Sequence, residues 1–427
     1  MVEESARKVG AAARERPLGG YRVIELPGAE SALFGKTFAD LGADVIKVEP
    51  PGGDPARSLP PFAPDGTSLY WAAYAAGKRS VTAAIETDAG RDLLRRLAVV
   101  ADIVAGALPA AWLDAPGDLG TELMRANPAL VLVAISPFGQ HGPYAGWRGS
   151  DLVQFALSGY LYMTGPPDGA PLKPSAPYQT WFHGCMHAVA AALLALRARR
   201  KDGRGALIDQ AMRDTGLWML THTTQFWDLL GMNLKRQGAS RDMGGVLRLP
   251  SVWKARDGYI VWMFQTGHIG GERVRLLVEW MADHGMAPDW LQALRWEEFD
   301  LLTAPPEMHA RLTATFAAFF ATKTKAELFA WALPRGVMLA PVQTLADVAT
   351  DPQLEARGAW RPYAGVEGAE QAAKPARVPG PPVRMSGARW EPRGPAPAVG
   401  QHNARVYGNL LGLSADTLAT LAATGTI

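Results

Sequence analysis

The chain has 427 residues, of which 48% are apolar and 20% are charged, and its formal net charge is +2. This is the composition of a folded globular protein rather than a disordered one, and the length allows more than one core. The small net charge argues against a nucleic-acid-binding protein, because such proteins usually carry a strongly basic surface.

Cysteine content and apolar runs indicate a cytoplasmic protein. Cys185 is the one cysteine of the chain, so no internal disulfide can form. The longest apolar run, Met186–Leu196, is too short to cross a bilayer. Residues 1–17 are charged and Ala-rich without an apolar signal core, and we expect a flexible N-terminal extension there.

The N-terminal half alternates short apolar strands with amphipathic helices. Gly42 ends the first helix as a C-terminal cap, and Thr87 opens the second as an N-cap. Such a β-α-β rhythm predicts the α/β class, with a mostly parallel sheet covered by helices. We expect strands over Arg22–Leu26, Asp44–Glu49, Ala101–Val104 and Leu130–Ile135, and helices over Ser31–Leu41 and Thr87–Ala98.

Beyond an Ala-rich helix expected from Gly184 to Arg199, the composition changes. From about Met232 the chain is rich in Trp, which indicates a second, smaller α+β domain. A Pro/Gly/Ala-rich stretch, Lys374–Val399, then reads as an extended linker. The remaining expected elements are a strand over Tyr259–Met263 and helices over Arg273–Asp283, Met308–Ala321 and Ala415–Thr424.

The strand Asp44–Glu49 runs into the turn Pro50–Asp54, and a basic loop, Ala76–Ser80, follows. A flexible Gly77 with Lys78 and Arg79 suits the phosphates of a nucleotide-like anion, although a lone Gly-Lys-Arg-Ser tetrad is more often a solvated turn. The spacing is not that of a phosphate-binding P-loop. The first strand also lacks the Gly-x-Gly-x-x-Gly turn of NAD-binding proteins.

A series of short motifs resembles, in order, the class III CoA-transferases, which include formyl-CoA and carnitine CoA-transferases and the related α-methylacyl-CoA racemases. Gly42–Glu49 is similar to the family's Gly-Ala-Asp-Val-Ile-Lys-Val-Glu signature without a mismatch. The other matching segments are Leu18–Leu26, Lys78–Ser80, Asn127–Val131, Ser136–Pro143, Ser150–Leu152, Leu157–Gly159, Gly203–Gly205, Asp257–Tyr259, Asp351–Gln353 and Gly400–His402.

The resemblance implies a Rossmann-like large domain, a smaller domain and a dimer of interlocked subunits. It places a large CoA-binding domain at 18–231 and a small domain at 232–345, with 346–427 as a linker that returns to the large domain. Gly77, Lys78, Arg79 and Arg148 would contact CoA. The substrates would be acyl-CoA and a small carboxylic acid, with no permanently bound cofactor and no metal.

In the family, an Asp before the Ala-rich helix attacks the thioester. Here Gly169–Lys201 contains no acidic residue, so the nucleophile position falls on Gln179, Thr180 or Trp181. An amide, a hydroxyl or an indole cannot form the mixed anhydride that this chemistry requires. The racemase branch uses the same Asp with a His at the position of Ser150, so racemisation is disfavoured as well.

Three nearby side chains could replace the missing Asp in the chemistry. His183 and His187 imitate a zinc-site spacing, but the general base would be Gly184 and no third ligand is evident. Cys185 could be a thiolate if the start of the helix lowered its pKa, although a lone Cys there usually only packs. His183 could act as an acid or base near the thioester, although a hydrogen-bonded His at a helix end is the commoner case.

Three interpretations remain open. The chain is a CoA-transferase subunit whose related partner chain supplies the Asp. Alternatively, it is a homodimer with altered chemistry on acyl-CoA, such as racemase or lyase activity, or a non-catalytic acyl-CoA-binding protein. None of the three involves nucleic acid or a membrane, and the acyl donor and acceptor acid are not fixed by these residues.

Overall fold

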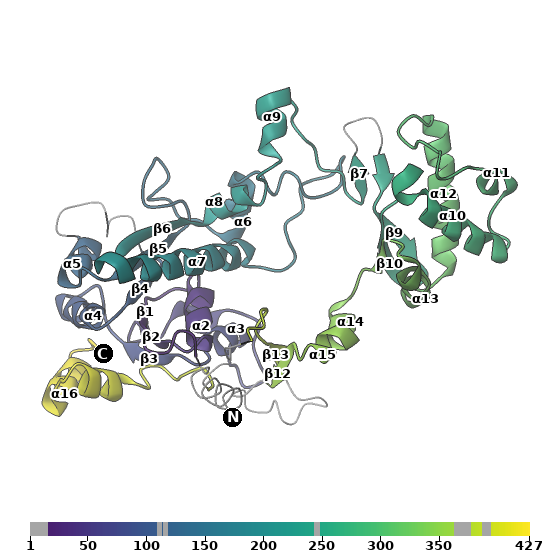
Figure 1. The fold of residues 1–427 in the computed structure, drawn as a ribbon. Helices are drawn as coiled ribbons and strands as arrows, with labels where there is room; N and C mark the ends of the chain where they lie inside the picture. The colour runs from purple at the N-terminus through teal and green to yellow at the C-terminus, as the bar shows by residue number, and fades with distance from the viewer. Residues whose placement is uncertain (1–15, 109–112, 114–117, 243–247, 363–376, 387–393) are drawn as a thin grey trace, which may run out of the picture. The chain divides into compact units, whose positions relative to one another are not determined.

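The computed structural model describes residues 16–108, 113, 118–242, 248–362, 377–386 and 394–427. Of the expected N-terminal extension, residues 1–15 lie outside this described part. The chain divides into two compact units (Figure 1), each with its own hydrophobic core. The first unit contains the described parts of Met1–Tyr160, Lys173–Gln225 and Gln353–Ile427, and the second contains Leu161–Leu172 and the described parts of Phe226–Pro352.

A six-stranded parallel sheet forms the centre of the first unit, in the order β3-β2-β1-β4-β5-β6. This is the strand order of the doubly wound Rossmann sheet, and it confirms the predicted α/β class. Every residue of β5 is buried, as expected for a strand covered on both faces. The strands are β1 (Arg22–Glu25), β2 (Asp44–Glu49), β3 (Arg79–Thr82), β4 (Ile103–Gly106), β5 (Val131–Ser136) and β6 (Ala206–Ala211).

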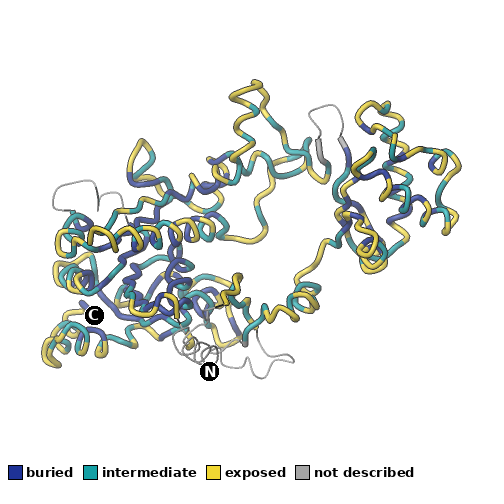
Figure 2. Tube along the Cα trace, in the orientation of Figure 1, coloured by how far each residue is buried: buried dark blue, intermediate teal, exposed yellow. Residues whose placement is uncertain are grey.

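Helices cover both faces of this sheet, and Figure 2 shows the buried residues concentrated in its strands. On one face, α2 (Ala32–Asp40) and α7 (Gln179–Asp202) share a core with alternate strand residues such as Val45. On the opposite face, α4 (Asp88–Val99) and α5 (Leu119–Ala126) pack on the strand residues that point to that side, such as Ile46. The unit also contains η1 (Pro55–Ser58), α3 (Leu69–Tyr74), α6 (Asp151–Leu157) and α8 (Met212–Trp218), and α9 (Thr224–Leu230) lies at the boundary of the two units.

The C-terminal segment returns to the first unit and packs along the edge strand β3. There, Ser80 O accepts from His402 N (2.9 Å) and Asn403 Oδ1 accepts from Thr82 N (2.9 Å). Tyr407, fully buried, donates its hydroxyl to Thr82 O at 2.7 Å. The segment therefore covers a sheet edge that would otherwise present unpaired backbone groups. Its elements are α15 (Pro352–Ala356), β12 (Trp360–Pro362), β13 (Arg377–Pro379), the π-helical η4 (Ala404–Leu410) and α16 (Ala415–Ala423).

The second unit is an α+β unit with a three-stranded antiparallel sheet in the order β11-β10-β9. Its core is aromatic: Trp262 of β10 packs edge-on against Phe316 and Phe320 of α12, at ring distances of 4.9 and 5.2 Å. The elements are β7 (Ser240–Asp242), β8 (Arg248–Pro250), β9 (Val252–Ala255), β10 (Gly258–Trp262), α10 (Gly267–Asp283), α11 (Asp289–Gln292), α12 (Pro306–Thr322), α13 (Lys325–Ala332), η3 (Leu333–Arg335), β11 (Leu339–Pro341) and α14 (Leu345–Ala349).

Three details differ from the expectations. The basic loop expected at Ala76–Ser80 is only partly a loop, because β3 begins at Arg79. The Ala-rich helix begins at Gln179, five residues before the expected Gly184. Residues 374–376 and 387–393 of the expected linker Lys374–Val399 lie outside the described residues, and its described part contains the short strand β13.

Candidate active site

Charged side chains are buried beside the carboxyl ends of β1 and β2. The carboxylate of Glu25 lies between two lysines, with Oε1 3.1 Å from Lys47 Nζ and Oε2 2.6 Å from Lys78 Nζ. Lys47 Nζ also lies 2.9 Å from Asp54 Oδ2, and these four side chains are at most 2% exposed. Buried charges are tolerated only when they are paired in this way, so the group is part of the architecture of the unit.

The two lysines differ in how well they are neutralised. Burial disfavours the charged form of Lys47, but the attraction of Glu25 and Asp54 outweighs the effect of burial, and the pKa of Lys47 is raised. Burial lowers the pKa of Lys78, and its single partner Glu25 does not fully offset this. We had expected Lys78 to face the phosphates of CoA. Its ammonium instead points into the protein, where it pairs with Glu25 and donates to Ala32 O at 2.9 Å.

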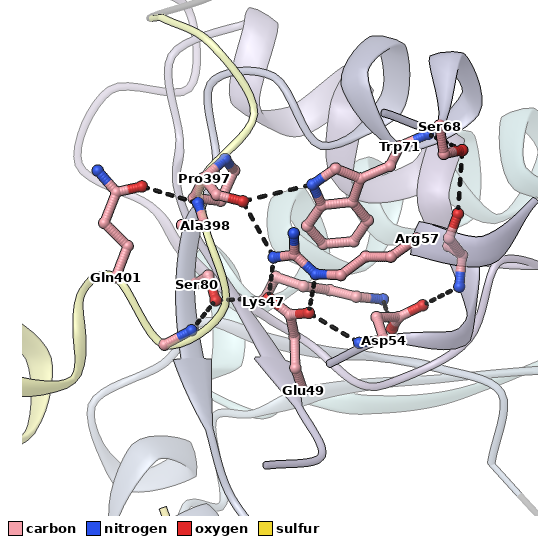
Figure 3. A network of polar contacts seen from close by, with 12 residues as sticks. Lys47, Glu49, Asp54, Arg57, Ser68, Trp71, Ser80, Pro397, Ala398 and Gln401 are labelled. Carbon is pink, nitrogen blue, oxygen red and sulfur yellow. Dashed lines mark hydrogen bonds and ion pairs between the residues drawn. The ribbon is translucent and has the colours of Figure 1, made fainter. Parts of the chain in front are cut away.

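The last residue of β2 ties the C-terminal segment to the sheet (Figure 3). Glu49 accepts from Arg57 through both carboxylate oxygens, from Nε at 2.7 Å and from Nη2 at 2.8 Å. The Arg57 guanidinium lies 3.8 Å from the ring centre of Trp71, and both side chains donate to Pro397 O. Two charged residues of the Gly42–Glu49 signature, Lys47 and Glu49, are therefore buried and hold loops in place, whereas Asp44 at its start is partly exposed.

The site where the resemblance places the nucleophile is the start of α7. This helix runs back toward β6 through the turn at Gly203, so its first residues lie at the carboxyl ends of the strands. In open α/β sheets this edge is the usual ligand site. Tyr178, directly before the helix, has a φ of 68°, the one positive φ of a non-glycine residue in the described part of the chain. Strained backbone of this kind is concentrated at functional sites.

The first turn of α7 contains no carboxylate, but one reaches it from α6. Asp151, the first residue of α6, accepts through Oδ1 from Thr180 N at 2.8 Å and from Thr180 Oγ1 at 2.6 Å. The Thr180 side chain, fully buried, also contacts Gln154 Oε1. Asp151 thus caps α7 from a neighbouring helix, which places its negative charge at the positive end of the helix dipole.

Aromatic side chains surround this helix start. Tyr178 stacks on Trp181 with ring centres 4.6 Å apart, and Tyr70 meets Tyr178 edge-on at 5.3 Å. Tyr74 and Phe182 extend the group, with ring centres 5.2 Å apart. Burial raises the pKa of Tyr70, so its hydroxyl stays protonated, and it donates to Ala29 O at 2.8 Å. The start of α7 therefore lies against a partly buried aromatic surface with few groups that could replace an attacking carboxylate.

The three candidate nucleophile positions have separate roles. Thr180 is buried and bonded to Asp151, and Trp181 is packed with its buried indole Nε1 unpartnered among the described residues. Gln179 donates its side-chain amide to Pro177 O at 3.3 Å. None of these groups can form an acyl anhydride.

We expect Thr180→Val to destabilise the first unit. The substitution keeps the shape but removes the hydroxyl, which leaves the buried Gln154 Oε1 without its donor at a cost of about 1–3 kcal/mol, while Asp151 keeps the bond from Thr180 N. Thr180→Ser, which keeps the hydroxyl, is the matched control. Urea unfolding of the three proteins measures the effect. A Val variant as stable as wild type would show that the contact contributes nothing.

The candidates for a substitute group are unfavourably placed. Cys185 is fully buried, donates its thiol to Glu30 O at 3.0 Å, and burial raises its pKa to about 12. This is opposite to the lowered pKa that a reactive thiolate needs, and it agrees with the packing role that is the usual one for a lone Cys. His183 and His187 are exposed on α7, and partial burial together with His187 lowers the pKa of His183. Within the described residues, no three His, Cys, Asp or Glu side chains are grouped as metal ligands.

Of the residues expected to bind CoA, Gly77, Lys78 and Arg79 lie together, and Arg148 lies apart from them. Arg148 is exposed two residues before Ser150, the N-cap of α6, and so lies near the start of α7. Gly77 and Arg79 precede and open β3, at the opposite, amino end of the sheet. There they line, together with Lys78, a cavity of about 660 Å³.

Sequence reasoning missed the two central contacts, Asp151 with Thr180 and Glu25 with Lys78. Asp151 had been noted only as part of the Ser150–Leu152 motif, and its position as the first residue of a helix was the one available signal. Glu25 and Lys47 interrupt otherwise apolar strands, and a charge at such a position requires a buried partner.

A Rossmann-type sheet with the start of α7 at its carboxyl edge defines a doubly wound α/β protein. Residues 18–403 match the model of CoA-transferase family III, so the chain belongs to this family of enzymes. The resemblance noted in the sequence is thereby confirmed. Within the described residues, no helix is long and apolar enough to span a membrane.

Named relatives match over most of their length. The chain is 30% identical to the succinyl-CoA:(R)-benzylsuccinate CoA-transferase subunit BbsE of Thauera aromatica, over 90% of this chain and 92% of that one. It is 31% identical to a succinate–glutarate CoA-transferase of Agrobacterium fabrum, over 93% and 96% of the two chains. A crystal structure of a CAIB/BAIF family protein from Brucella suis superimposes with a TM-score of 0.77 at 28% identity, covering 93% of this chain and all of that one.

Proposed function

We propose that this chain is the non-nucleophilic subunit of a CoA-transferase, and that a related chain bearing the catalytic Asp completes the enzyme. The start of α7 carries the proposal: Gln179, Thr180 and Trp181 supply no carboxylate, and Thr180 is already bonded to Asp151. The name of BbsE describes it as a subunit, which supports the same assignment for this chain.

The reaction explains why the acid is indispensable. The carboxylate of the partner's Asp attacks the thioester carbonyl of the donor, which forms a mixed anhydride and expels CoA thiolate. The thiolate then attacks the enzyme-side carbonyl, which releases the donor acid and leaves CoA as a thioester on the Asp. The acceptor carboxylate attacks that thioester and expels the thiolate again, and the thiolate takes the acceptor acyl group and restores the Asp. A thioester is exchanged for a thioester, so the step consumes no ATP and uses no metal.

The substrates are proposed from the relatives. Succinyl-CoA as donor agrees with the name of BbsE, and a dicarboxylic acid as acceptor agrees with the benzylsuccinate and glutarate in the names of the two relatives. Arg148, exposed near the carboxyl edge of the sheet, is the cation that we assign to a CoA phosphate. A cytoplasmic location belongs to the proposal as well, since Cys185 is the single cysteine of the chain and is a free thiol.

The experiment is native mass spectrometry of the protein purified from its own source with succinyl-CoA present. The proposal predicts a heteromer that contains a related chain with an Asp at the start of its own α7 helix. A homodimer that turns over acyl-CoA would overturn it.

A second candidate is a homodimer with altered acyl-CoA chemistry, and Asp151 favours it. Its carboxylate lies 2.6 Å from Thr180 Oγ1, close to where the nucleophile is expected. Activity of the lone chain that disappears in Asp151→Asn would support this candidate. A non-catalytic acyl-CoA-binding protein would instead bind CoA, lose affinity in Arg148→Gln, and show no turnover with any partner.

A further inference from the structure

The amino end of the sheet contains a cavity that the transfer reaction does not use. It has a volume of about 660 Å³, and its lining comes from the first residues of β1, β2 and β3 and from the C-terminal segment after Gly394. All of these belong to the first unit. The volume falls within the usual range of small-molecule sites, about 300–1,000 Å³.

The cavity is strongly cationic. Arg22 and Arg79 both pair with Asp44, so one carboxylate is shared between two guanidinium groups. The Nε of Arg79 is buried and has no hydrogen-bond partner among the described residues. Arg405 of η4 also lines the cavity, is exposed, and forms no ion pair within the described part of the chain. Positive charge thus exceeds negative charge around the opening.

His402 lies beside these charges. It lines the cavity, and its Nδ1 accepts from Ser80 N at 3.1 Å, which fixes the orientation of the ring. Partial burial lowers its pKa, and the nearby Arg79 and Arg405 lower it further. The ring thus lies beside two guanidinium groups that share Asp44 and beside Arg405, which has no ion-pair partner among the described residues.

The rest of the lining suits a ligand that has an uncharged organic part as well as charged groups. Gln401 and Asn409 provide amide groups, and Pro395, Pro397 and Leu410 provide apolar surface. We propose that this cavity binds a nucleoside diphosphate through its phosphate groups, at a site separate from the acyl-transfer edge. Strands of four to six residues, at about 3.3 Å per residue, separate the two edges of the sheet.

Titration calorimetry of the full chain with ADP and with inorganic pyrophosphate tests this. We expect both probes to bind, with affinity that falls as salt rises. Arg405→Gln should weaken ADP binding at least about tenfold, because it removes a charge-assisted contact to phosphate. Arg200→Gln, an exposed arginine at the far end of α7, is the matched control, and circular dichroism of each variant checks folding.

CoA itself contains an ADP group, so a parallel titration with CoA distinguishes the proposed site from the CoA site. CoA should lose affinity in Arg148→Gln but not in Arg405→Gln, and Arg405→Gln should leave CoA transfer by the complete enzyme intact. Absence of ADP and pyrophosphate binding at millimolar concentration would overturn the inference. So would ADP binding unchanged by Arg405→Gln, or CoA affinity that depends on Arg405. None of these results decides whether the chain is a transferase subunit.

Discussion

Purified alone, this chain is expected to transfer CoA from succinyl-CoA to a dicarboxylic acid at least about a thousandfold more slowly than the complete heteromer. Loss of a covalent nucleophile commonly costs several powers of ten in rate, at about 1.4 kcal/mol for each. The physical reason is that the groups at the start of α7 are an amide, a hydroxyl held by Asp151 and an indole. Chromatographic detection of the product acyl-CoA, with and without the partner chain, measures the ratio.

Two controls sharpen this comparison. Replacing the catalytic Asp of the partner with Asn should abolish activity of the heteromer, whereas Asp151→Asn in this chain should leave measurable transfer. Turnover by the lone chain at the rate of the heteromer, lost in Asp151→Asn or His183→Ala, would contradict the subunit assignment.

Glu25→Gln is expected to destabilise the first unit by about 3–5 kcal/mol, the usual cost of removing one partner of a buried ion pair. The substitution preserves shape but leaves Lys78 without a carboxylate, while Lys47 keeps Asp54. The melting temperature should fall on the order of 10 °C. Differential scanning calorimetry measures it, and Glu86→Gln, an exposed carboxylate on the same unit, is the matched control with almost no expected change.

The pH dependence of Glu25→Gln has a defined sign. Burial lowers the pKa of Lys78 below its ordinary value of 10.5, and loss of Glu25 must lower it further. Between the folded value and 10.5, the unfolded chain then binds more protons than the folded one, so the stability of the variant rises with pH. The deficit relative to wild type should therefore shrink as the solution becomes alkaline. A deficit that grows with pH would contradict the assignment of Glu25 as the partner of Lys78.

The sheet of the first unit follows closely from local patterns. The second strand was predicted at its observed bounds, Asp44–Glu49, and Thr87 caps its helix by accepting from Gly90 N. These elements are predictable because apolar periodicity and caps are encoded within a few neighbouring residues. The start of α7 was missed by five residues because its cap is not local: Tyr178 has no side-chain cap bond, and Asp151 supplies the carboxylate from 29 positions away.

The orientation of charged side chains was harder to foresee. Lys78 and Arg79 are adjacent in sequence, yet Lys78 is buried against Glu25 while Arg79 opens into the amino-edge cavity. Lys78 lies in the loop before β3 and Arg79 is the first residue of the strand, so the direction of each side chain depends on where the strand begins. When Gly77–Ser80 is treated as a loop, the sequence does not show that Lys78 and Arg79 face different surroundings. Buried partners such as Glu25 become visible only when the strands are aligned side by side.

The most direct test of the subunit assignment is to locate the covalent CoA adduct. The heteromer is mixed with succinyl-CoA, quenched in acid, and each chain is weighed by intact-protein mass spectrometry. The account predicts CoA in thioester linkage on the partner chain and an unmodified mass for this one. A CoA adduct on this chain, mapped to Asp151 or to any other of its residues, would contradict it.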